Sequence, residues 1–458
     1  MPETAPWETS VAPHYFRLRE LPRRVGRRVA LLARYPDRDP AMPQFIPNLG
    51  LYMIAAALRA PVLPDLEVKT WDITGGNAER VAAEVIAFDP DIVGCSVYLW
   101  SLQFFLDVAV TVKVDDPARL VTFGGPSARP VMLNLEPHRQ KSSAVDLLVI
   151  NEGEITFRDV VERGDRSPAA LAGIPGLAVR IQGAWRETTA RPVGDLNLLP
   201  SPYEMSLMPG RGLGILQTYR GCPFTCSFCE WGTMESPKRV RTADSLCAEF
   251  DAMERIGLRG ALLADAGLNL NPAAFQNLQL AAEKTGFLAN RGLICEVYPA
   301  KVRQEHLDFL GGIGDAYVGV GLQSFDNKVL ANVERRYDEA RFDDTLRALR
   351  EVAHVAVEII LGLPGDAPEN FRRNFERARR LPCALRVYHC VVLPSALMVR
   401  SPPEHQLDYD PVTLKMRSCL GWPAVMLAEE AAFLTREALA VGGRAGEYFW
   451  VFPPPNTN

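Results

Sequence analysis

Short apolar runs alternate with amphipathic stretches along most of this 458-residue chain, and the alternation restricts the folds open to it. Within residues 27–164 the runs predict strands at Val29–Ala33, Leu66–Trp71 and Asp91–Val97, each followed by a helical stretch. Strands that alternate with helices form parallel sheets covered on both faces. We therefore expect an α/β protein that begins with a doubly wound, Rossmann-like domain over residues 27–164.

The alternation resumes after residues 165–210, whose proline punctuation predicts a linker. Six further strands are predicted at Ile215–Thr218, Gly260–Asp265, Leu293–Tyr298, Ala316–Gly321, Val355–Leu361 and Leu385–Val392. Six such units predict a partial (β/α)6 barrel over residues 211–395, open on one side. Residues 396–458 lack the pattern and predict a small C-terminal cap, and residues 1–26 predict a loose polar tail.

Composition excludes several classes of protein. Fifty basic side chains stand against 55 acidic ones, giving a formal net charge of -5, whereas nucleic-acid binding needs a basic surface. Hydrophobic residues make up 48% of the chain, too many for a disordered one. No apolar run approaches the ~20 residues that cross a bilayer, and the N-terminus has no signal-peptide pattern. We expect a cytoplasmic protein with no membrane or nucleic-acid partner.

Three of the nine cysteines, Cys222, Cys226 and Cys229, fall within eight residues, and the other six are scattered. The spacing C-x3-C-x2-C on a loop with Gly and Pro can turn three thiolates toward one centre. Three thiolates hold three irons of a [4Fe–4S] cluster and leave the fourth iron open, whereas a closed structural site takes four ligands. A zinc site completed by His389 or Cys247 is one alternative, although zinc sites usually show paired C-x2-C ligands. Three unrelated core cysteines are the other.

The cysteine spacing, with Phe228 before the last cysteine, resembles the radical S-adenosylmethionine (SAM) superfamily. Three later segments also resemble its motifs: LLADAGLN at 262–269, GLQSFDNKVLANVERR at 321–336 and EIILGLPGDAPENF at 358–371. The resemblance implies that the open iron binds SAM and reductively splits its sulfonium. The resulting 5′-deoxyadenosyl radical would then abstract a hydrogen from the substrate.

By the same resemblance, Phe228 would meet the adenine of SAM through its backbone, and Gln323 and Ser324 would face the ribose or the methionine part. Asp265 and Asn269 would lie near the methionine part. The alternative for Asp265 is a strand-end cap, and for Gln323 an ordinary loop hydrogen bond.

Loops at the predicted strand ends of the first domain offer a second cofactor site. No G-x-G-x-x-G opens a helix there, which disfavours NAD or FAD. The loops instead resemble the cobalamin-binding domain that precedes the radical domain in a large class of radical SAM enzymes. The residues that would contact cobalamin are Ser96, Tyr98, Leu99, Trp100, Gly124, Gly125, Pro126, Asn151, Glu152, Gly153 and Glu154.

The chain departs from other cobalamin domains because it lacks a D-x-H-x-x-G motif, and the neighbours of His138 do not match one. The resemblance therefore implies that Tyr98, Leu99 or Trp100 packs against the lower face of the corrin. The alternative is that Tyr98 and Trp100 are core aromatics between helix and sheet.

Titratable residues near the predicted barrel strand ends are candidate acids or bases: Tyr298, Glu296 and Tyr388, together with His389. The alternative for each is a satisfied core residue.

Together the resemblances imply a cobalamin-dependent radical SAM methyltransferase with a [4Fe–4S] cluster, SAM and cobalamin as cofactors. The expected acceptor is a carbon of a small-molecule, specialised-metabolite substrate, and the expected partner is a flavodoxin- or ferredoxin-like electron donor. One alternative keeps both cofactors for cyclisation, ring contraction or rearrangement without methylation. The other is a non-catalytic metal- or corrinoid-binding protein.

Overall fold

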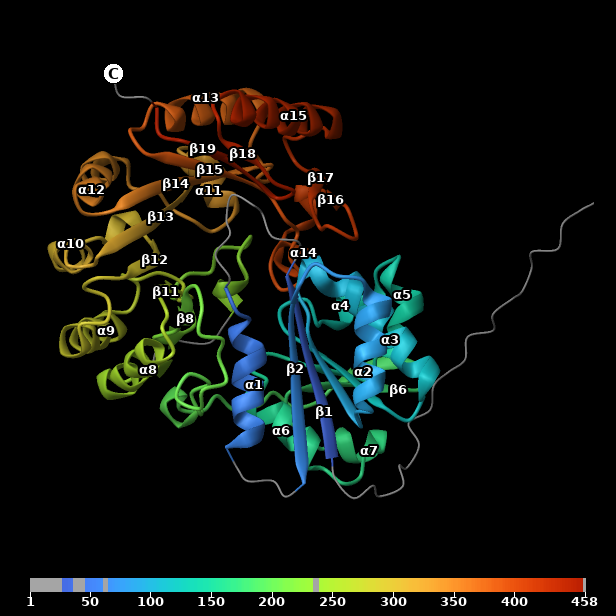
Figure 1. Ribbon diagram of the computed structural model, residues 1–458. Coiled ribbons are helices and arrows are strands. Elements are labelled where there is room, and N and C mark those ends of the chain that lie inside the picture. The colour runs from blue at the N-terminus through green and yellow to red at the C-terminus, as the bar shows by residue number, and fades with distance from the viewer. Residues whose placement is uncertain (1–26, 36–45, 61–64, 234–238, 456–458) are drawn as a thin grey trace, which may run out of the picture. The chain divides into compact units, whose positions relative to one another are not determined.

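The computed structural model describes residues 27–35, 46–60, 65–233 and 239–455, which form two compact units (Figure 1). Of the described residues, the first unit comprises 27–35 and 65–192, and the second comprises 46–60, 193–233 and 239–455. The predicted tail at residues 1–26 lies outside the described residues. In the described part of the chain, no helix combines the length and the apolar character that a membrane span requires.

The first unit is built on a seven-stranded sheet in the order β2-β1-β3-β4-β5-β6-β7. Its strands are β1 (Arg27–Tyr35), β2 (Leu66–Thr74), β3 (Ile92–Ser96), β4 (Leu120–Gly124), β5 (Leu147–Val149), β6 (Leu177–Ile181) and β7 (Ala184–Glu187). Strands β1 to β5 pair in parallel, and β6 and β7 add an antiparallel hairpin at one edge. The order reverses at β1, and such sheets bind ligands beyond the carboxyl ends of their strands at this switch point. The predicted Rossmann-like fold is confirmed.

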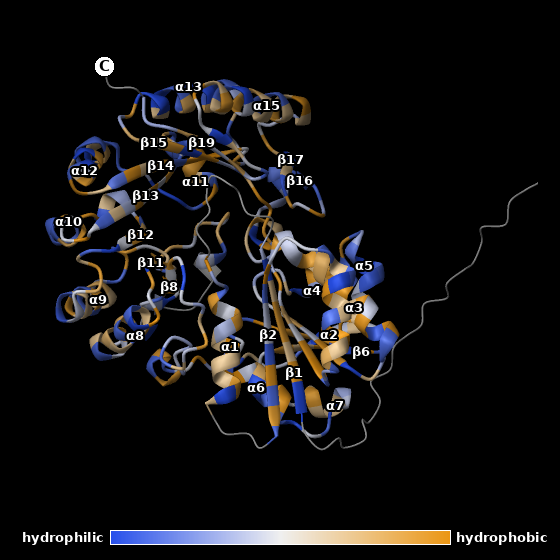
Figure 2. Cartoon of the chain, viewed as in Figure 1, coloured by the Kyte–Doolittle hydropathy of each residue, from blue (hydrophilic) through white to orange (hydrophobic). Residues whose placement is uncertain are grey.

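Burial on both faces explains why the strand runs of the first unit are continuously apolar. Five consecutive residues of β1, Val29–Ala33, are buried, as are Ile92–Cys95 of β3. Gly94 of β3 lies under a helix, because a Cβ there would come within 2.9 Å of the Phe157 ring. The helices are α2 (Ala78–Phe88), α3 (Leu102–Asp115), α4 (Pro130–Asn134), α5 (His138–Lys141), α6 (Glu154–Glu162) and α7 (Pro168–Leu171). Figure 2 shows β1 mostly orange, while α2 and α3 carry hydrophobic and hydrophilic stretches.

The second unit contains an eight-stranded sheet in the order β18-β19-β15-β14-β13-β12-β11-β8. The six parallel strands are β8 (Gly214–Leu216), β11 (Gly260–Leu263), β12 (Gly292–Val297), β13 (Asp315–Gln323), β14 (His354–Leu361) and β15 (Ala384–His389). Strands β18 (Arg444–Ala445) and β19 (Phe449–Phe452) continue the sheet beyond β15 in antiparallel pairing. Because β8 and β18 stand at opposite edges, the predicted partial barrel is confirmed as open.

Helices cover the outer side of this curved sheet (Figure 1). They are α8 (Ala243–Arg255), α9 (Pro272–Thr285), α10 (Gln304–Gly311), α12 (Glu339–Val352) and α13 (Pro368–Arg379). The side chains of Thr242 and Asn271 cap the N-termini of α8 and α9, which fixes where each helix starts. The remaining elements of the unit are α1 (Leu49–Arg59), β9 (Tyr219–Arg220), β10 (Arg239–Val240), α11 (Asn327–Asn332), α14 (Leu397–Arg400), β16 (Asp408–Tyr409), β17 (Met416–Ser418) and α15 (Ala424–Ala440).

Candidate functional site

Three cysteines lie in one loop that follows β8 and the two-residue strand β9. Cys226 is 6% exposed, and the thiols of Cys222 and Cys229 are half-buried. The backbone N–H of Cys229 donates to the carbonyl of Cys226 at 3.0 Å, so these two cysteines share a tight turn. All three predicted metal ligands are therefore carried by one segment at the carboxyl end of the barrel strands, where barrel active sites lie.

Asp265, just beyond β11, braces the chain before this loop. Its carboxylate accepts the backbone N–H groups of Thr218 at 2.8 Å and Tyr219 at 3.4 Å, and also the Thr218 hydroxyl. Complete burial raises the pKa of Asp265 to about 7, although these three donors act in the opposite direction. This geometry is that of a strand-end cap, and contact with the methionine part of SAM stays a prediction.

Arg335 places a positive charge beside the cysteine loop. Its Nη1 lies 3.8 Å from Sγ of Cys226, and its Nη2 donates to the Gly321 carbonyl. Its guanidinium also stands 5.0 Å from the centroid of the Tyr298 ring, which itself lies 4.6 Å from the Phe224 ring. A neighbouring guanidinium favours the thiolate that iron requires. Sequence reasoning did not single out Arg335, which lies 109 residues from Cys226 along the chain.

The cysteine loop is the predicted site of the iron–sulfur cluster, and this assignment stays a prediction. Within the described ranges, no three His, Cys, Asp or Glu side chains are drawn close enough to surround one metal ion. A [4Fe–4S] cluster is larger, so its three thiolates stand farther apart than the ligands of one atom. The buried hydroxyl of Ser227, between two of the cysteines, also lacks a hydrogen-bond partner in the described part of the chain. Burial raises the pKa of Cys222, and the Arg335 guanidinium opposes that rise.

The structure brings two other predicted residues together. Asn269 and Tyr298 exchange hydrogen bonds, with Nδ2 donating to the Tyr298 carbonyl at 2.8 Å and Oδ1 accepting its N–H at 2.9 Å. Ser324 is buried, and its hydroxyl accepts from the backbone N–H of Asp326 at 3.1 Å. Gln323 ends β13 with a φ of 74°, a left-handed conformation that marks a special turn. Phe228 is half-buried within the cysteine loop.

A polar cluster of Glu296, Glu358, Arg386 and Tyr388 lies on neighbouring strands of the barrel sheet. Arg386 Nη1 stands 3.2 Å from Glu358 Oε1 and 4.0 Å from Glu296 Oε1, and the Tyr388 hydroxyl donates to Glu358 at 3.2 Å. Burial and the nearby Glu358 carboxylate raise the pKa of Glu296 well above its ordinary range, against the effect of Arg386. The candidates Glu296 and Tyr388 thus belong to one cluster. Tyr298 instead lies against the cysteine loop.

Gly319 on β13 makes room for the Glu296 carboxylate of this polar cluster. Glu296 of β12 pairs with Gly319, Gly321 pairs with Glu358 of β14, and Glu358 pairs with Arg386 of β15. A Cβ at Gly319 would lie 2.2 Å from the Glu296 carboxylate, so that carboxylate occupies the place of a missing side chain. Glu358 and Arg386 were not predicted as site residues. Each lies inside a strand, β14 or β15, and not in the loop that follows a strand, where site residues were expected.

His389 does not join the polar cluster by any contact described. Its Nδ1 lies 3.1 Å from the Cys390 carbonyl, and burial lowers its pKa, so the ring is neutral at pH 7.

The predicted cobalamin loops of the first unit all follow parallel strands. Ser96 ends β3, Gly124 ends β4, and the Val97 N–H donates to the Gly124 carbonyl at 2.6 Å. Gly125 has a φ of 95°, and a Cβ there would lie 2.8 Å from the Val97 carbonyl oxygen. Only glycine fits this close turn, which is followed by the exposed Pro126. The bare backbone gives a broad ligand access to the sheet edge.

Aromatic rings stack beside that edge. The rings of Tyr98 and Trp100 lie 4.8 Å apart at 12°, and the Tyr35 ring lies 6.0 Å from Trp100. Trp100 is 37% exposed, and its Nε1 donates to the Arg34 carbonyl at 3.0 Å. The stack therefore presents a flat, partly open surface and is not simply core packing. Leu99 is half-buried between the two rings in sequence. Tyr35 is a member that the sequence analysis missed.

The third predicted loop leads into α6. Asn151 is exposed with a φ of 65°, Gly153 is the N-cap, and Glu154 is buried in the first turn. Glu152 is half-buried between them. His138, in contrast, is fully buried in α5, where its Nδ1 meets Gln103 Nε2 at 2.9 Å.

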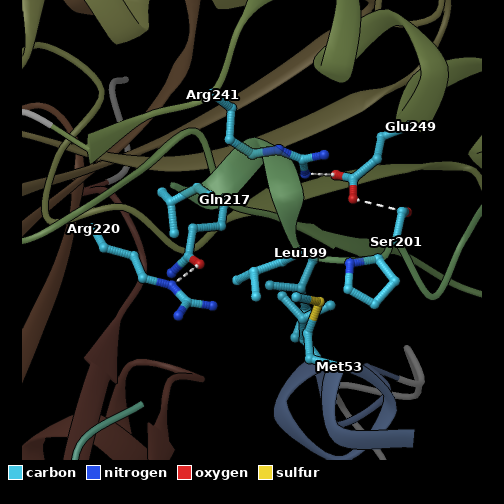
Figure 3. Close-up of a pocket in the computed structure, with 11 residues that line it drawn as sticks. Met53, Leu199, Ser201, Gln217, Arg220, Arg241 and Glu249 are labelled. Carbon is cyan, nitrogen blue, oxygen red and sulfur yellow. Dashed lines mark hydrogen bonds and ion pairs between the residues drawn. The ribbon is translucent and has the colours of Figure 1, made fainter. Parts of the chain in front are cut away.

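An open hollow in the second unit is lined in part by Gln217 and Arg220, which precede the cysteine loop (Figure 3). Arg241 pairs with Glu249 at 2.5 Å, Ser201 donates to the same carboxylate, and Arg220 donates to Gln217 at 2.8 Å. The hollow is lined by Leu49, Met53, Leu196, Leu199, Pro200, Ser201, Ile215, Gln217, Arg220, Arg241 and Glu249. None of these residues was predicted as a site residue, and the hydrogen bond from Ser201 to Glu249 ties the 196–201 segment to α8.

Two family models match the chain. The model of the B12 binding domain matches residues 41–161, and that of the Radical SAM superfamily matches residues 216–378. Among curated relatives, "Cobalamin-dependent radical SAM methyltransferase TokK" of Streptomyces tokunonensis is 28% identical over 370 residues, covering 75% of this chain and 53% of its own length. "Uncharacterized methyltransferase PH0819" of Pyrococcus horikoshii is 24% identical over 372 residues, covering 77% of this chain and 78% of its own.

Solved structures agree on the fold. A structure of the radical S-adenosylmethionine methyltransferase TsrM from Kitasatospora setae has a TM-score of 0.64 at 20% identity, covering 81% of this chain and 74% of that one. A structure of the cobalamin-dependent S-adenosylmethionine radical enzyme OxsB has a TM-score of 0.67 at 15% identity. The match covers 91% of this chain and 67% of the OxsB chain. The chain spans about half the length of the first curated relatives, 53% of one and 48% of another.

Proposed function

Because the chain belongs to the cobalamin-binding radical SAM enzymes, we propose that it transfers a methyl group to a carbon centre of a small-molecule substrate. The observation that carries the proposal is the tandem of a B12-binding match and a radical SAM match on one chain. Relatives named as methyltransferases, matched over more than two thirds of this chain, support the reaction type.

When bound, the [4Fe–4S] cluster, SAM and cobalamin supply electron transfer, a carbon radical and a carrier for the methyl group. This combination suits a carbon with no acidic proton, which ordinary nucleophilic attack does not methylate. The protein's part is to bind, orient and shield these groups.

In the second unit, Cys222, Cys226 and Cys229 would hold three irons, and Arg335 would balance the negative charge of the thiolates. The turn at Gln323 and Ser324 and the Phe228 backbone would receive SAM. Asp265 and Asn269 would support the SAM site indirectly, because their side chains hydrogen-bond to the backbones of Thr218 and Tyr298.

In the first unit, the stacked rings of Tyr98 and Trp100 would form the surface under the corrin, with Leu99 between them. The glycine turn at Gly124–Gly125 would let the corrin edge approach the backbone. The residues of the third loop, 151–154, would line the same edge of the sheet.

The polar cluster gives the barrel a carboxyl group that holds its proton more tightly than an exposed glutamate does. Burial and the neighbouring Glu358 carboxylate raise the pKa of Glu296 well above its ordinary range, and Arg386 compensates the charge of Glu358. Such a pair can donate or accept a proton as the substrate changes charge. A flavodoxin- or ferredoxin-like protein would deliver the electron.

The proposal is tested with protein reconstituted anaerobically with iron, sulfide and cobalamin. Iron near four per chain, a corrinoid spectrum, and release of both 5′-deoxyadenosine and S-adenosylhomocysteine from SAM are expected. Release of 5′-deoxyadenosine alone with substrate turnover would identify a cyclase or rearrangement enzyme. A colourless preparation that binds only zinc would reject the radical mechanism.

A further inference from the structure

The segment after β15 returns to the cysteine loop and holds it from the side of its backbone carbonyls. Arg400, the last residue of α14, donates from Nη1 to the Thr225 carbonyl at 3.1 Å. Its Nη2 donates to the carbonyls of Cys226 at 2.9 Å and Cys229 at 2.6 Å. One guanidinium therefore spans three carbonyls of the turn that carries two of the thiolates.

A second contact anchors the same segment to the loop. The backbone N–H of Ser395 donates to Oε1 of Glu230, the residue after Cys229, at 3.0 Å. Ala396 and Leu397 between these contacts are fully buried, which fixes the segment from which Arg400 extends. In the described part of the chain, Nε of Arg400 has no hydrogen-bond partner, so the hydrogen bonds of this guanidinium go to the loop.

The chemistry of three converging carbonyls explains why an arginine is needed here. Their negative ends would repel one another in a half-buried place, and a cation that donates to all three removes that cost. A guanidinium presents several N–H donors in a rigid fork, whereas an ammonium is a compact point charge. Arg335 acts on the other side of the same turn, at the sulfur of Cys226.

We propose that Arg400 is a positioning residue that holds the turn Thr225–Cys229 in the shape required for cluster ligation. The inference rests on the proposed function, because it takes the loop to be the cluster site. Arg400 fixes the backbone so that the sulfurs keep their spacing, and its charge favours the more negative, reduced state of the cluster. Residues that orient metal ligands in this way affect metal retention without touching the metal.

The test compares wild-type protein with R400Q and R400K after anaerobic reconstitution. The control is R379Q, because Arg379 also donates to one backbone carbonyl, that of Pro453 at 2.9 Å, but does so from the outer helix α13. The first measurement is the rate at which a chelator removes iron. The second is the midpoint potential of the cluster, followed by electron paramagnetic resonance.

R400Q is expected to lose iron at least about tenfold faster than wild type and to have a more negative midpoint potential. R400K should have a midpoint potential close to that of wild type, because the positive charge remains, but should still lose iron about threefold faster than wild type. R379Q should match wild type in both measurements. If R400Q does not fold, R400K decides, since wild-type iron retention in R400K overturns the proposal. Equal iron-loss rates in wild type and R400Q overturn it as well. Wild-type protein that takes up no iron and sulfide would instead reject the function on which the proposal rests.

Discussion

Asp265 illustrates what a single residue reveals only in three dimensions. The sequence marked it as polar at a strand end, which left a ligand contact and a cap equally open. The structure shows three donors from Thr218 and Tyr219 converging on a buried carboxyl whose pKa is raised to about 7. A sequence cannot supply that value, because it depends on the balance between desolvation and hydrogen bonding.

Replacing Asp265 by Asn should remove part of the pH dependence of stability. In the wild type the folded state keeps a proton that the unfolded chain, with a carboxyl pKa of about 4, has lost. The free energy of unfolding therefore falls as pH rises from about 4 to 7, by roughly 3 kcal/mol for this group. Denaturant unfolding at pH 5 and pH 7.5 should show a smaller difference in D265N. An unchanged difference would mean that Asp265 is ionised throughout.

The contacts that two arginines make with the cysteine loop could not be predicted from the sequence. Arg335 and Arg400 both reach the cysteine loop, yet they lie 109 and more than 170 residues further along the chain. The chain has 50 basic residues, and although Arg335 lies in the motif-like segment 321–336, nothing local shows that either arginine reaches the cysteine loop. The cysteines themselves were predictable, because their spacing is short and carries its chemistry within eight residues.

At the scale of secondary structure, the parallel strands were predictable because each is a buried apolar run followed by an amphipathic helix. All six predicted barrel strands have a counterpart among β8 and β11 to β15. The antiparallel strands at the edges of the two sheets were harder to predict from the sequence. The strand-like pieces at β6 and β7 were assigned to a linker and β19 to a cap, whereas they extend the two sheets. Which edge a hairpin joins depends on long-range pairing, which leaves no periodic signal.

The turn after β4 offers a matched test. G125A should destabilise the protein by about 2–4 kcal/mol, because alanine combines left-handed strain with a Cβ 2.8 Å from the Val97 carbonyl. G76A is the control, since Gly76 has a φ of 90° but nothing within 4 Å of its Cβ, and it should cost only about 1 kcal/mol. Denaturant midpoints and bound cobalamin per chain measure both effects. Equal losses in the two variants would show that the close approach does not matter.

The glycine that pairs with Glu296 offers a second test. G319A should push the Glu296 carboxyl away from Arg386 and lower stability by about 1–3 kcal/mol. The double variant G319A/E296A removes the group that clashes, so its loss should be smaller than the sum of the two single losses by at least about 1 kcal/mol. Strictly additive losses in denaturant unfolding would contradict the arrangement.

For the whole molecule, the two predicted cofactor sites belong to separate compact units. The triple variant C222A/C226A/C229A should therefore lose the iron–sulfur cluster and SAM cleavage completely but bind cobalamin at close to the wild-type level. Iron and sulfide assays, 5′-deoxyadenosine release and the corrinoid spectrum measure these outcomes. Loss of corrinoid binding in that variant would show that the two sites depend on each other.

The substrate lay beyond prediction for a different reason. Cofactor motifs are local and chemically constrained, so they can be recognised from a few residues in the sequence. Polar groups inside the barrel, such as Glu296, Glu358 and Arg386, are brought together only by the order of strands in the sheet. The family matches support the proposed class of reaction, and the acceptor molecule stays a matter for experiment.

The long reach of Arg400 bears on how the iron centre is assembled in a cell. Its hydrogen bonds join residues 171 to 175 positions apart in the sequence. When the three cysteines have just left the ribosome, the arginine that holds their loop has therefore not yet been synthesised. A nascent chain offered metal at that stage would present an unsupported loop. Maturation enzymes that deliver the cluster should then act after translation has passed the last parallel strand, and protein truncated before residue 400 should lose iron faster than the full chain.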